Sequence, residues 1–276
     1  MLKRYILFLK KYPLITAALA VVYAMICIGS IPAESFFQML ILRTLLCGAM
    51  VFFLYQISGE KTLTSYTEST GYVIKVAMGF WIFALPVGLL SFIAAAGADY
   101  PVREDATLQL ITCFFMFGFV GLFEEMTFRA VINDAIIYRF REKKYVFVLS
   151  AVCCSLVFGA VHIVGANLST PLAWAQAAGK TVSAGVFGLA LLFLYWKTRN
   201  IWACGIVHGV FDFLVGFNMG ILETPERTAS YVVPDENAAA VLIVYAVQTV
   251  IELLILLAVW KKIGKKINYQ EIRETW

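Results

Sequence analysis

The sequence predicts an all-α protein, built as a polytopic bundle of transmembrane helices. Three observations favour this class: the composition, the spacing of long apolar runs, and the distribution of basic residues between those runs. Of the 276 residues, 61% are hydrophobic and 14% are charged, and the mean hydropathy is +0.82. A soluble domain carries about 25% charged residues. No soluble fold of this length could bury so much apolar surface, so lipid must surround most of the chain.

Eight segments are apolar enough to cross a bilayer, which takes about 20 residues in helical form. They are Pro13–Ile31, Phe36–Ile57, Gly71–Gly97, Thr107–Ile132, Tyr145–Ala166, Leu172–Tyr195, Asn200–Met219 and Ala238–Trp260. Short loops join them, and the sequence has no internal repeat and no linker long enough to separate domains. We therefore expect a single integral-membrane domain over residues 1–276.

Basic residues favour one side of the expected membrane. If the N-terminus is cytoplasmic, the inner segments hold sixteen lysines and arginines, whereas the outer loops hold only Arg103 and Arg227. Positive charge concentrates in the cytoplasmic loops of membrane proteins. The bias predicts cytoplasmic N- and C-termini in a multi-pass protein of the cell membrane. The compact loops favour a bacterial cytoplasmic membrane.

The fourth segment contains an ionisable cluster, Phe123-Glu-Glu-Met-Thr-Phe-Arg129. Ionisable side chains at mid-membrane cost about 2.5–3.5 kcal/mol each, which makes them candidates for function. Glu125 and Arg129 are four residues apart, so they share a helix face and can pair. Glu124 then points about 100° away around the helix, where it is free to act as a base. The alternative is a purely structural charge cluster at a helix end.

The two histidines of the chain lie in the fifth and seventh segments. His162 ends the pattern Phe158-Gly-Ala-Val-His162, and His208 is four residues from Asp212 on the same helix face. Each has a structural explanation when taken singly. His162 could be a hydrogen-bonded core residue, and His208 with Asp212 could be a pair that only holds helices together. Because both histidines lie in transmembrane segments within polar patterns, their combination with Glu124 favours one shared site.

The spacing also predicts where the groups meet. Glu124 and His162 are each nineteen residues from Lys143, which lies at the charged tip between the fourth and fifth segments. Straight helices would put both about 28 Å from that tip, facing each other. His208 is only about nine residues from the cytoplasmic start of its helix near Arg199. The fourth and fifth helices should therefore project roughly two turns into the cytoplasm, which places the site in the cytoplasmic half of the bilayer.

These residue types suggest a hydrolytic chemistry. A carboxylate and a neutral imidazole at one height can bind and deprotonate a water molecule. A second histidine beside an acid can donate hydrogen bonds to a developing oxyanion. No serine or cysteine lies in a recognisable nucleophile motif. The residues therefore favour hydrolysis of an amide by activated water, without a covalent intermediate.

The chain resembles one known family, the CPBP group of CAAX proteases and bacteriocin-processing enzymes, also called the Abi family. Three motifs carry the resemblance: Glu124-Glu-x-x-x-Arg129, Phe158-x-x-x-His162 and His208-x-x-x-Asp212. The run Leu191–Ala203 before the third motif is also similar. The resemblance covers about residues 107–215, which we expect to form the catalytic core.

The resemblance implies a metal-independent glutamic intramembrane endopeptidase without a cofactor. According to this resemblance, Glu124 and His162 would activate water, and Phe158 would be a packing residue of the second motif. The implied partners are membrane lipid and a peptide or membrane-protein substrate, which is prenylated in eukaryotic members. No nucleic acid is expected.

The remaining motif residues have supporting roles in the family. Glu125 would pair with Arg129, and His208 with Asp212 would form the oxyanion site. The best-studied members carry Asn where this chain has Asp212, although the family pattern admits either. An ionised Asp would oppose an oxyanion, so Asp212 must be protonated or must orient His208.

Two other interpretations of these residues remain open. Two histidines with Glu124 would make a His₂Glu set of the kind that zinc uses, although the HExxH helix motif is absent. The second is a non-proteolytic membrane protein, either a proton-coupled transporter or an immunity or scaffold factor. Carboxylates and histidines in membrane helices also form proton relays.

Overall fold

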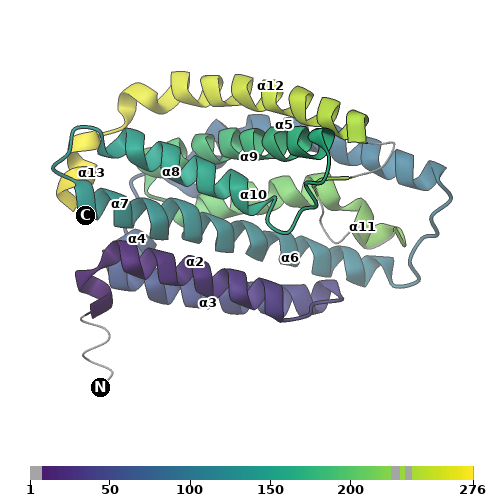
Figure 1. Cartoon of the computed structure of the whole chain (residues 1–276), viewed down its shortest axis with the longest axis horizontal. Helices are drawn as coiled ribbons and strands as arrows, with labels where there is room; N and C mark the ends of the chain where they lie inside the picture. The colour runs from purple at the N-terminus through teal and green to yellow at the C-terminus, as the bar shows by residue number, and fades with distance from the viewer. Residues whose placement is uncertain (1–7, 225–230, 234–237, 276) are drawn as a thin grey trace.

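The computed structural model describes residues 8–224, 231–233 and 238–275. Within these ranges the structure is helical, apart from one isolated antiparallel bridge between Val102 and Leu222. Figure 1 shows long helices that run roughly parallel to one another as a single bundle. The expected fold class, a polytopic helical bundle, is confirmed.

The helices follow the order of the apolar segments. Their bounds are α2 Pro13–Ser30, α3 Phe36–Ser58, α4 Lys61–Thr64, α5 Thr70–Gly97, α6 Ala106–Glu125, the π-helical segment η1 Met126–Ile132, α7 Asn133–Phe140, α8 Val146–Val161, α9 Pro171–Thr198, α10 Ile201–Gly216, α11 Asn218–Ile221, α12 Ala238–Ile263, the 3₁₀ segment η2 Gly264–Lys266, and α13 Tyr269–Thr275.

All eight expected segments contain a helix, but they differ in length. Six helical stretches of the described chain are long and apolar enough to span a membrane, and one of them runs without a break from Ala106 to Phe140. The other two, α8 and α10, have only 16 residues each. At 1.5 Å per residue each is about 24 Å long, less than the roughly 30 Å hydrocarbon core of a bilayer.

The outward faces of the helices are apolar, as a lipid environment requires. Ile82 and Leu90 of α5, Val148 of α8 and Leu254 of α12 each have more than 60% of their surface exposed. In water such faces would lose the hydrophobic contribution of burial, whereas lipid tails match them. The chain is therefore a multi-pass membrane protein.

Helix α10 is at the centre of the packing. It packs most extensively against α6 and α5, while α9 packs against α12 and α8, and α3 packs against α6. In Figure 1, α2 and α3 lie along one side of the bundle and α12 along the opposite side. The start of α2, the end of α7 and helix α13 all lie at the same end of the bundle (Figure 1).

Glycines let α6 and α10 approach closely. A methyl group on Gly209 of α10 would lie 2.7 Å from the Cα of Gly118 on α6, and one on Gly205 would lie 2.9 Å from the Cα of Leu122. Any larger residue would collide with backbone at these positions. Small residues at a helix interface are the usual means of close packing in membranes. The close contact brings the end of α6, with its two glutamates, next to His208.

A buried polar network ties α7 to its neighbours at the end of the bundle where the basic loops lie. The carboxylate of Asp134 accepts hydrogen bonds from Ser58, Thr62, Asn133 and Tyr195, and lies 3.8 Å from Nη2 of Arg199. Asn133 in turn accepts from Ser150 and from the indole of Trp196. Side chains from α3, α4, α7, α8 and α9 are thereby joined, so α7 is packed against protein. The sequence analysis did not single out Asp134.

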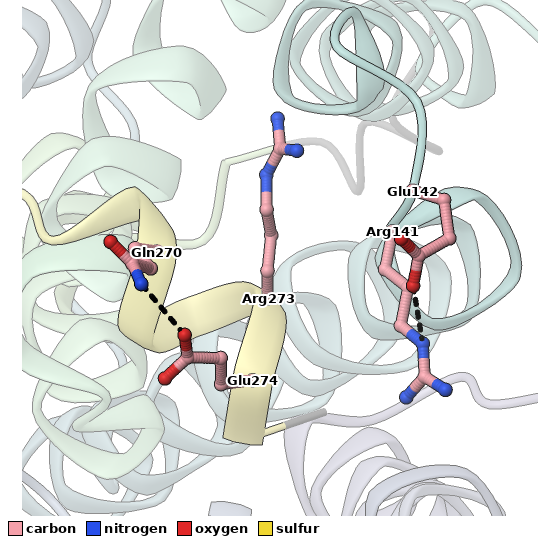
Figure 2. A pocket seen from close by; sticks show the side chains of 5 residues that line it. All are labelled: Arg141, Glu142, Gln270, Arg273 and Glu274. Carbon is pink, nitrogen blue, oxygen red and sulfur yellow. Dashed lines mark hydrogen bonds and ion pairs between the residues drawn. The ribbon is translucent and has the colours of Figure 1, made fainter.

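A shallow polar depression also lies at this end, between the tip of the α7–α8 hairpin and α13. Its lining side chains are Arg141, Glu142, Gln270, Arg273 and Glu274. Figure 2 shows the contacts among them, Arg141 with Glu142 at 3.5 Å and Gln270 with Glu274 at 2.8 Å. None of the motif residues lines it.

Candidate active site

Glu125, at the last position of α6, lies between Arg129 and His208. One carboxylate oxygen is 3.2 Å from Nε of Arg129, and the other is 2.9 Å from Nδ1 of His208. Its side chain is fully buried. The contact with Arg129 agrees with the four-residue spacing in the sequence. The contact with His208 crosses from α6 to α10 and was not expected.

Arg129 lies in the π-helical segment that follows Glu125. Its guanidinium group is 4.1 Å from the ring centroid of Phe158, and its side chain is only 1% exposed. A methyl group on Gly188 of α9 would lie 2.6 Å from Nη2 of Arg129, so glycine is needed there to make room. The sequence analysis expected a regular α-helix here. The wider π turns, which are frequent at functional sites, were not visible in the apolar pattern.

His208 is surrounded by carboxylates. Nδ1 contacts Glu125, while Nε2 lies 3.7 Å from a carboxylate oxygen of Glu124 and 3.5 Å from one of Asp212. The ring packs edge-on against Phe187 and Phe158. Three acids from α6 and α10 thus meet at one buried imidazole. Only Glu124 and Asp212 keep some exposure, 19% and 24% of their side chains.

His162 lies just after α8 ends. The sequence analysis continued this helix to Ala166, which is wrong because the chain leaves the α-helix after Val161 and turns. Nδ1 of His162 lies 2.7 Å from the carbonyl oxygen of Phe158. The imidazole also contacts the rings of Phe158 and Tyr231, with centroids 4.9 and 5.4 Å away. Its position at a helix end lets the ring turn toward the cluster.

Glu124 and His162 make no direct hydrogen bond or ion pair within the described chain. The carboxylate of Glu124 instead lies 3.7 Å from Nε2 of His208. Glu124 still lies close enough to act on His162 electrostatically, as His208 does. A separation bridged by one water molecule stays a prediction.

Further ionisable groups near the motifs were missed by the sequence analysis. Lys180 of α9 lies within electrostatic range of Glu124 and Asp212, and its ammonium group is 4.1 Å from the ring centroid of Tyr231. Glu252 of α12 is 1% exposed. Both lie inside apolar segments, so the rule that singled out Glu124 applies to them equally. Tyr231 is in a loop, and nothing in its local sequence signals its place beside His162.

Metal ligation was an open alternative. In the part of the chain that the structure describes, no group of three or more His, Cys, Asp or Glu side chains is arranged to hold a metal ion. The carboxylates that surround His208 approach it as ion-pair and hydrogen-bond partners.

Comparison with protein families adds an independent observation. Residues 106–214 match the Rce1-like family model, described as Type II CAAX prenyl endopeptidase Rce1-like. Over these residues, about two fifths of the chain, the protein is similar to the CAAX protease family. The matched segment runs from the first residue of α6 into α10 and contains all three motifs. No curated protein and no solved structure matches the chain significantly.

This similarity supports a general activity for the CAAX-protease-like chain. The family acts as a membrane-embedded endopeptidase, so membrane lipid is its environment and peptides are its substrates. Lys180 lies inside the matched segment, whereas Tyr231 and Glu252 lie outside it. Two residues that contribute to the surroundings of the motifs are therefore not part of the matched core.

Proposed function

We propose that this protein is a metal-independent intramembrane endopeptidase in which Glu124 and His162 activate the water that cleaves a peptide bond. The observation that supports it is the arrangement of three acids around the buried His208, with His162 close to that cluster. A purely structural cluster would keep all its acids buried, as Glu125 is. Glu124 and Asp212 instead remain partly exposed, as groups that meet water or substrate must be.

The protonation pattern of His162 suits this role. The Phe158 carbonyl oxygen can only accept a hydrogen bond, so a neutral ring carries its proton on Nδ1 and donates it there. Nε2 then keeps a lone pair, which can accept a hydrogen bond from water. Glu124 removes the other proton of that water as its oxygen attacks the peptide carbonyl carbon.

His208 is the proposed oxyanion donor. With Nδ1 bonded to Glu125, a proton on Nε2 can donate to the negative oxygen of the tetrahedral intermediate. Asp212, 3.5 Å from the same nitrogen, orients the ring or acts in its protonated form. The carbon–nitrogen bond then breaks, and the proton held by Glu124 passes to the leaving amine. The products are a carboxylate and a free amine.

The finer setting of the reaction belongs to the same proposal. We infer a peptide or membrane-protein substrate, with lipidation as one form, in a bacterial cytoplasmic membrane. The partly exposed acids lie in a bundle whose outer faces are apolar, so a substrate that is itself membrane-associated could reach them from the bilayer.

Mass spectrometry of protein termini tests the proposal. Membranes from cells with wild-type protein should contain cleaved termini that disappear with Glu124→Gln or His162→Ala, and the double variant should be little worse than either, as for groups that act as a unit. His208→Ala should lower the rate about 10²–10³-fold, the effect of a lost oxyanion donor. The exposed Arg139→Ala serves as the matched control and should cleave normally.

Two further measurements distinguish the glutamic mechanism from a metal-dependent one. Asp212→Asn should keep substantial activity if the residue orients His208 or acts protonated, and chelators should have no effect. Loss of activity both in Asp212→Asn and in the wild type treated with chelators would indicate a metal-dependent enzyme. Full activity of Glu124→Gln would rule out the glutamic mechanism.

A further inference from the structure

Lys180 is a cation within an apolar bundle, in the middle of α9. It lies within electrostatic range of Glu252, Asp212 and Glu124, and it also acts on His162. It is only partly exposed, so its charge is largely removed from water. A lysine in such a place normally pairs with an acid or faces a polar cavity.

No acid in the described ranges directly pairs with Lys180. Its ammonium group has neither an ion pair within 4.0 Å nor a hydrogen bond there, and its close contact is the face of the Tyr231 ring. The nearest candidate, Glu252, is already satisfied by neutral donors. One of its oxygens accepts from Ser183 and the other from Gln248, each at 2.7 Å. Among the acids that the structure describes, the charge of Lys180 is therefore balanced only at a distance.

Tyr231 links this ammonium to the motif residues. The ammonium nitrogen of Lys180 lies 4.1 Å from the ring centroid of Tyr231. The same ring contacts the imidazole of His162, with 5.4 Å between the centroids. The backbone around Tyr231 is held in place. Its carbonyl accepts a hydrogen bond from Tyr245, and the amide of Gln176 exchanges two hydrogen bonds with the backbone of Val233. Lys180 and the proposed water-activating histidine thus contact the same tyrosine ring.

We propose that Lys180 binds a carboxylate of the peptide substrate, either the C-terminal carboxylate or an Asp or Glu side chain. This inference rests on the proposed function. A carboxylate is the complementary group for an ammonium that has no ion pair among the described residues, and the pair is strong where water is excluded. Because one tyrosine ring touches both Lys180 and His162, an extended peptide at ~3.3 Å per residue would place that carboxylate within a few residues of the cleaved bond.

A cleavage assay with peptides of defined ends tests Lys180. The probe is a random decapeptide library, synthesised once with free C-terminal carboxylates and once with C-terminal amides, and incubated with purified full-length protein. A second pair of libraries contains or lacks Asp and Glu. Mass spectrometry gives the rate and the position of cleavage. The wild type should cleave at least one carboxylate-bearing library about tenfold faster than its neutral partner.

Variants of Lys180 assign the preference to this side chain. Lys180→Met should abolish the preference, because cleavage of the preferred library should fall about tenfold more than cleavage of the neutral one. Lys180→Arg should keep most of the preference. The library pair that shows the difference identifies the source of the carboxylate, terminal or side-chain.

Other results would overturn the inference. One such result is that the wild type cleaves the carboxylate-bearing and the neutral library of each pair at equal rates. This measurement needs no variant, so it holds even if Lys180→Met fails to fold. An equal loss of cleavage rate on the charged and the neutral libraries in Lys180→Met would also overturn the inference, because it indicates a structural role for Lys180. In both cases cleavage that still depends on Glu124 leaves the proposed function standing. Cleavage that is unaffected by Glu124→Gln would instead contradict the proposed function.

Discussion

Arg129 carries a full charge with almost no contact with solvent. Its compensation comes from one carboxylate, that of Glu125 at 3.2 Å, and from the face of Phe158. The two charged groups are close, but their atoms are not aligned as a hydrogen bond, and the other guanidinium nitrogens have no acceptor among the described residues. Such a pair contributes little to stability compared with an apolar core. Removing one partner, however, leaves the other charge buried and uncompensated.

We therefore expect Arg129→Ala to lower the stability by about 3–5 kcal/mol. Glu124→Gln should change it much less, because Glu124 is partly exposed and glutamine keeps its hydrogen-bonding capacity. The thermal unfolding midpoint of the purified protein in detergent measures both. The exposed Arg139→Ala is the control for removal of an arginine as such. Equal losses in Arg129→Ala and Glu124→Gln would contradict this division between a supporting and a reactive acid.

At the scale of the elements, the contact of α6 with α10 determines the geometry of the site. Glu124 and Glu125 end α6, while His208 and Asp212 lie on α10, so the distances between them depend on how closely the two helices approach. Gly209 is next to His208 and would place a methyl group 2.7 Å from the backbone of α6. Backbone cannot rotate away as a flexible side chain can, so the helices would have to separate.

The replacement Gly209→Ala should therefore reduce activity far more than its small size suggests, since a displacement of about 1 Å can cost roughly 10²-fold in rate. Gly118→Ala is a matched control on the facing helix, because a methyl group there meets no atom within 4 Å. Terminal mass spectrometry and the thermal midpoint should both be measured for the two variants. Normal cleavage by Gly209→Ala would show that the close approach does not set the site geometry.

At the scale of the whole molecule, the two ends of the bundle differ in chemistry. The described chain begins and ends at one end, where the α7–α8 tip, η2 and α13 bring many basic residues together (Figure 1). The buried network around Asp134 lies toward this end and joins α7 to α3, α4, α8 and α9. The opposite end carries the loop after α8 (Figure 1).

This asymmetry predicts the orientation in the membrane. A fluorescent reporter that matures only in the cytoplasm should be active when fused after Trp276, because positive charge is retained on the cytoplasmic side. A reporter inserted near Tyr100, between α5 and α6, should behave as extracytoplasmic and serves as the control. A reversed pattern would contradict the charge-based orientation, whereas both reporters on the same side would contradict the expected number of crossings.

The sequence by itself determined the membrane class, the order of the helices and the three motifs. These follow from local features. Apolar length selects lipid as the solvent, and a spacing of four residues puts Glu125 and Arg129 on one face of one helix. The expected segments agree with the observed helices to within a few residues at most boundaries. Such features need no knowledge of which helix lies beside which.

Contacts between residues of different helices could be learned only from the packing of the helices in the structure. The convergence of Glu124, Glu125 and Asp212 on His208 depends on glycines that let α6 meet α10. A tyrosine far along the chain contacts both Lys180 and His162. The early end of α8 likewise turned His162 out of a regular helix. Periodicity reports the face of a residue on its own helix. It carries no information on the packing partner, because packing is fixed by the shapes of several helices together.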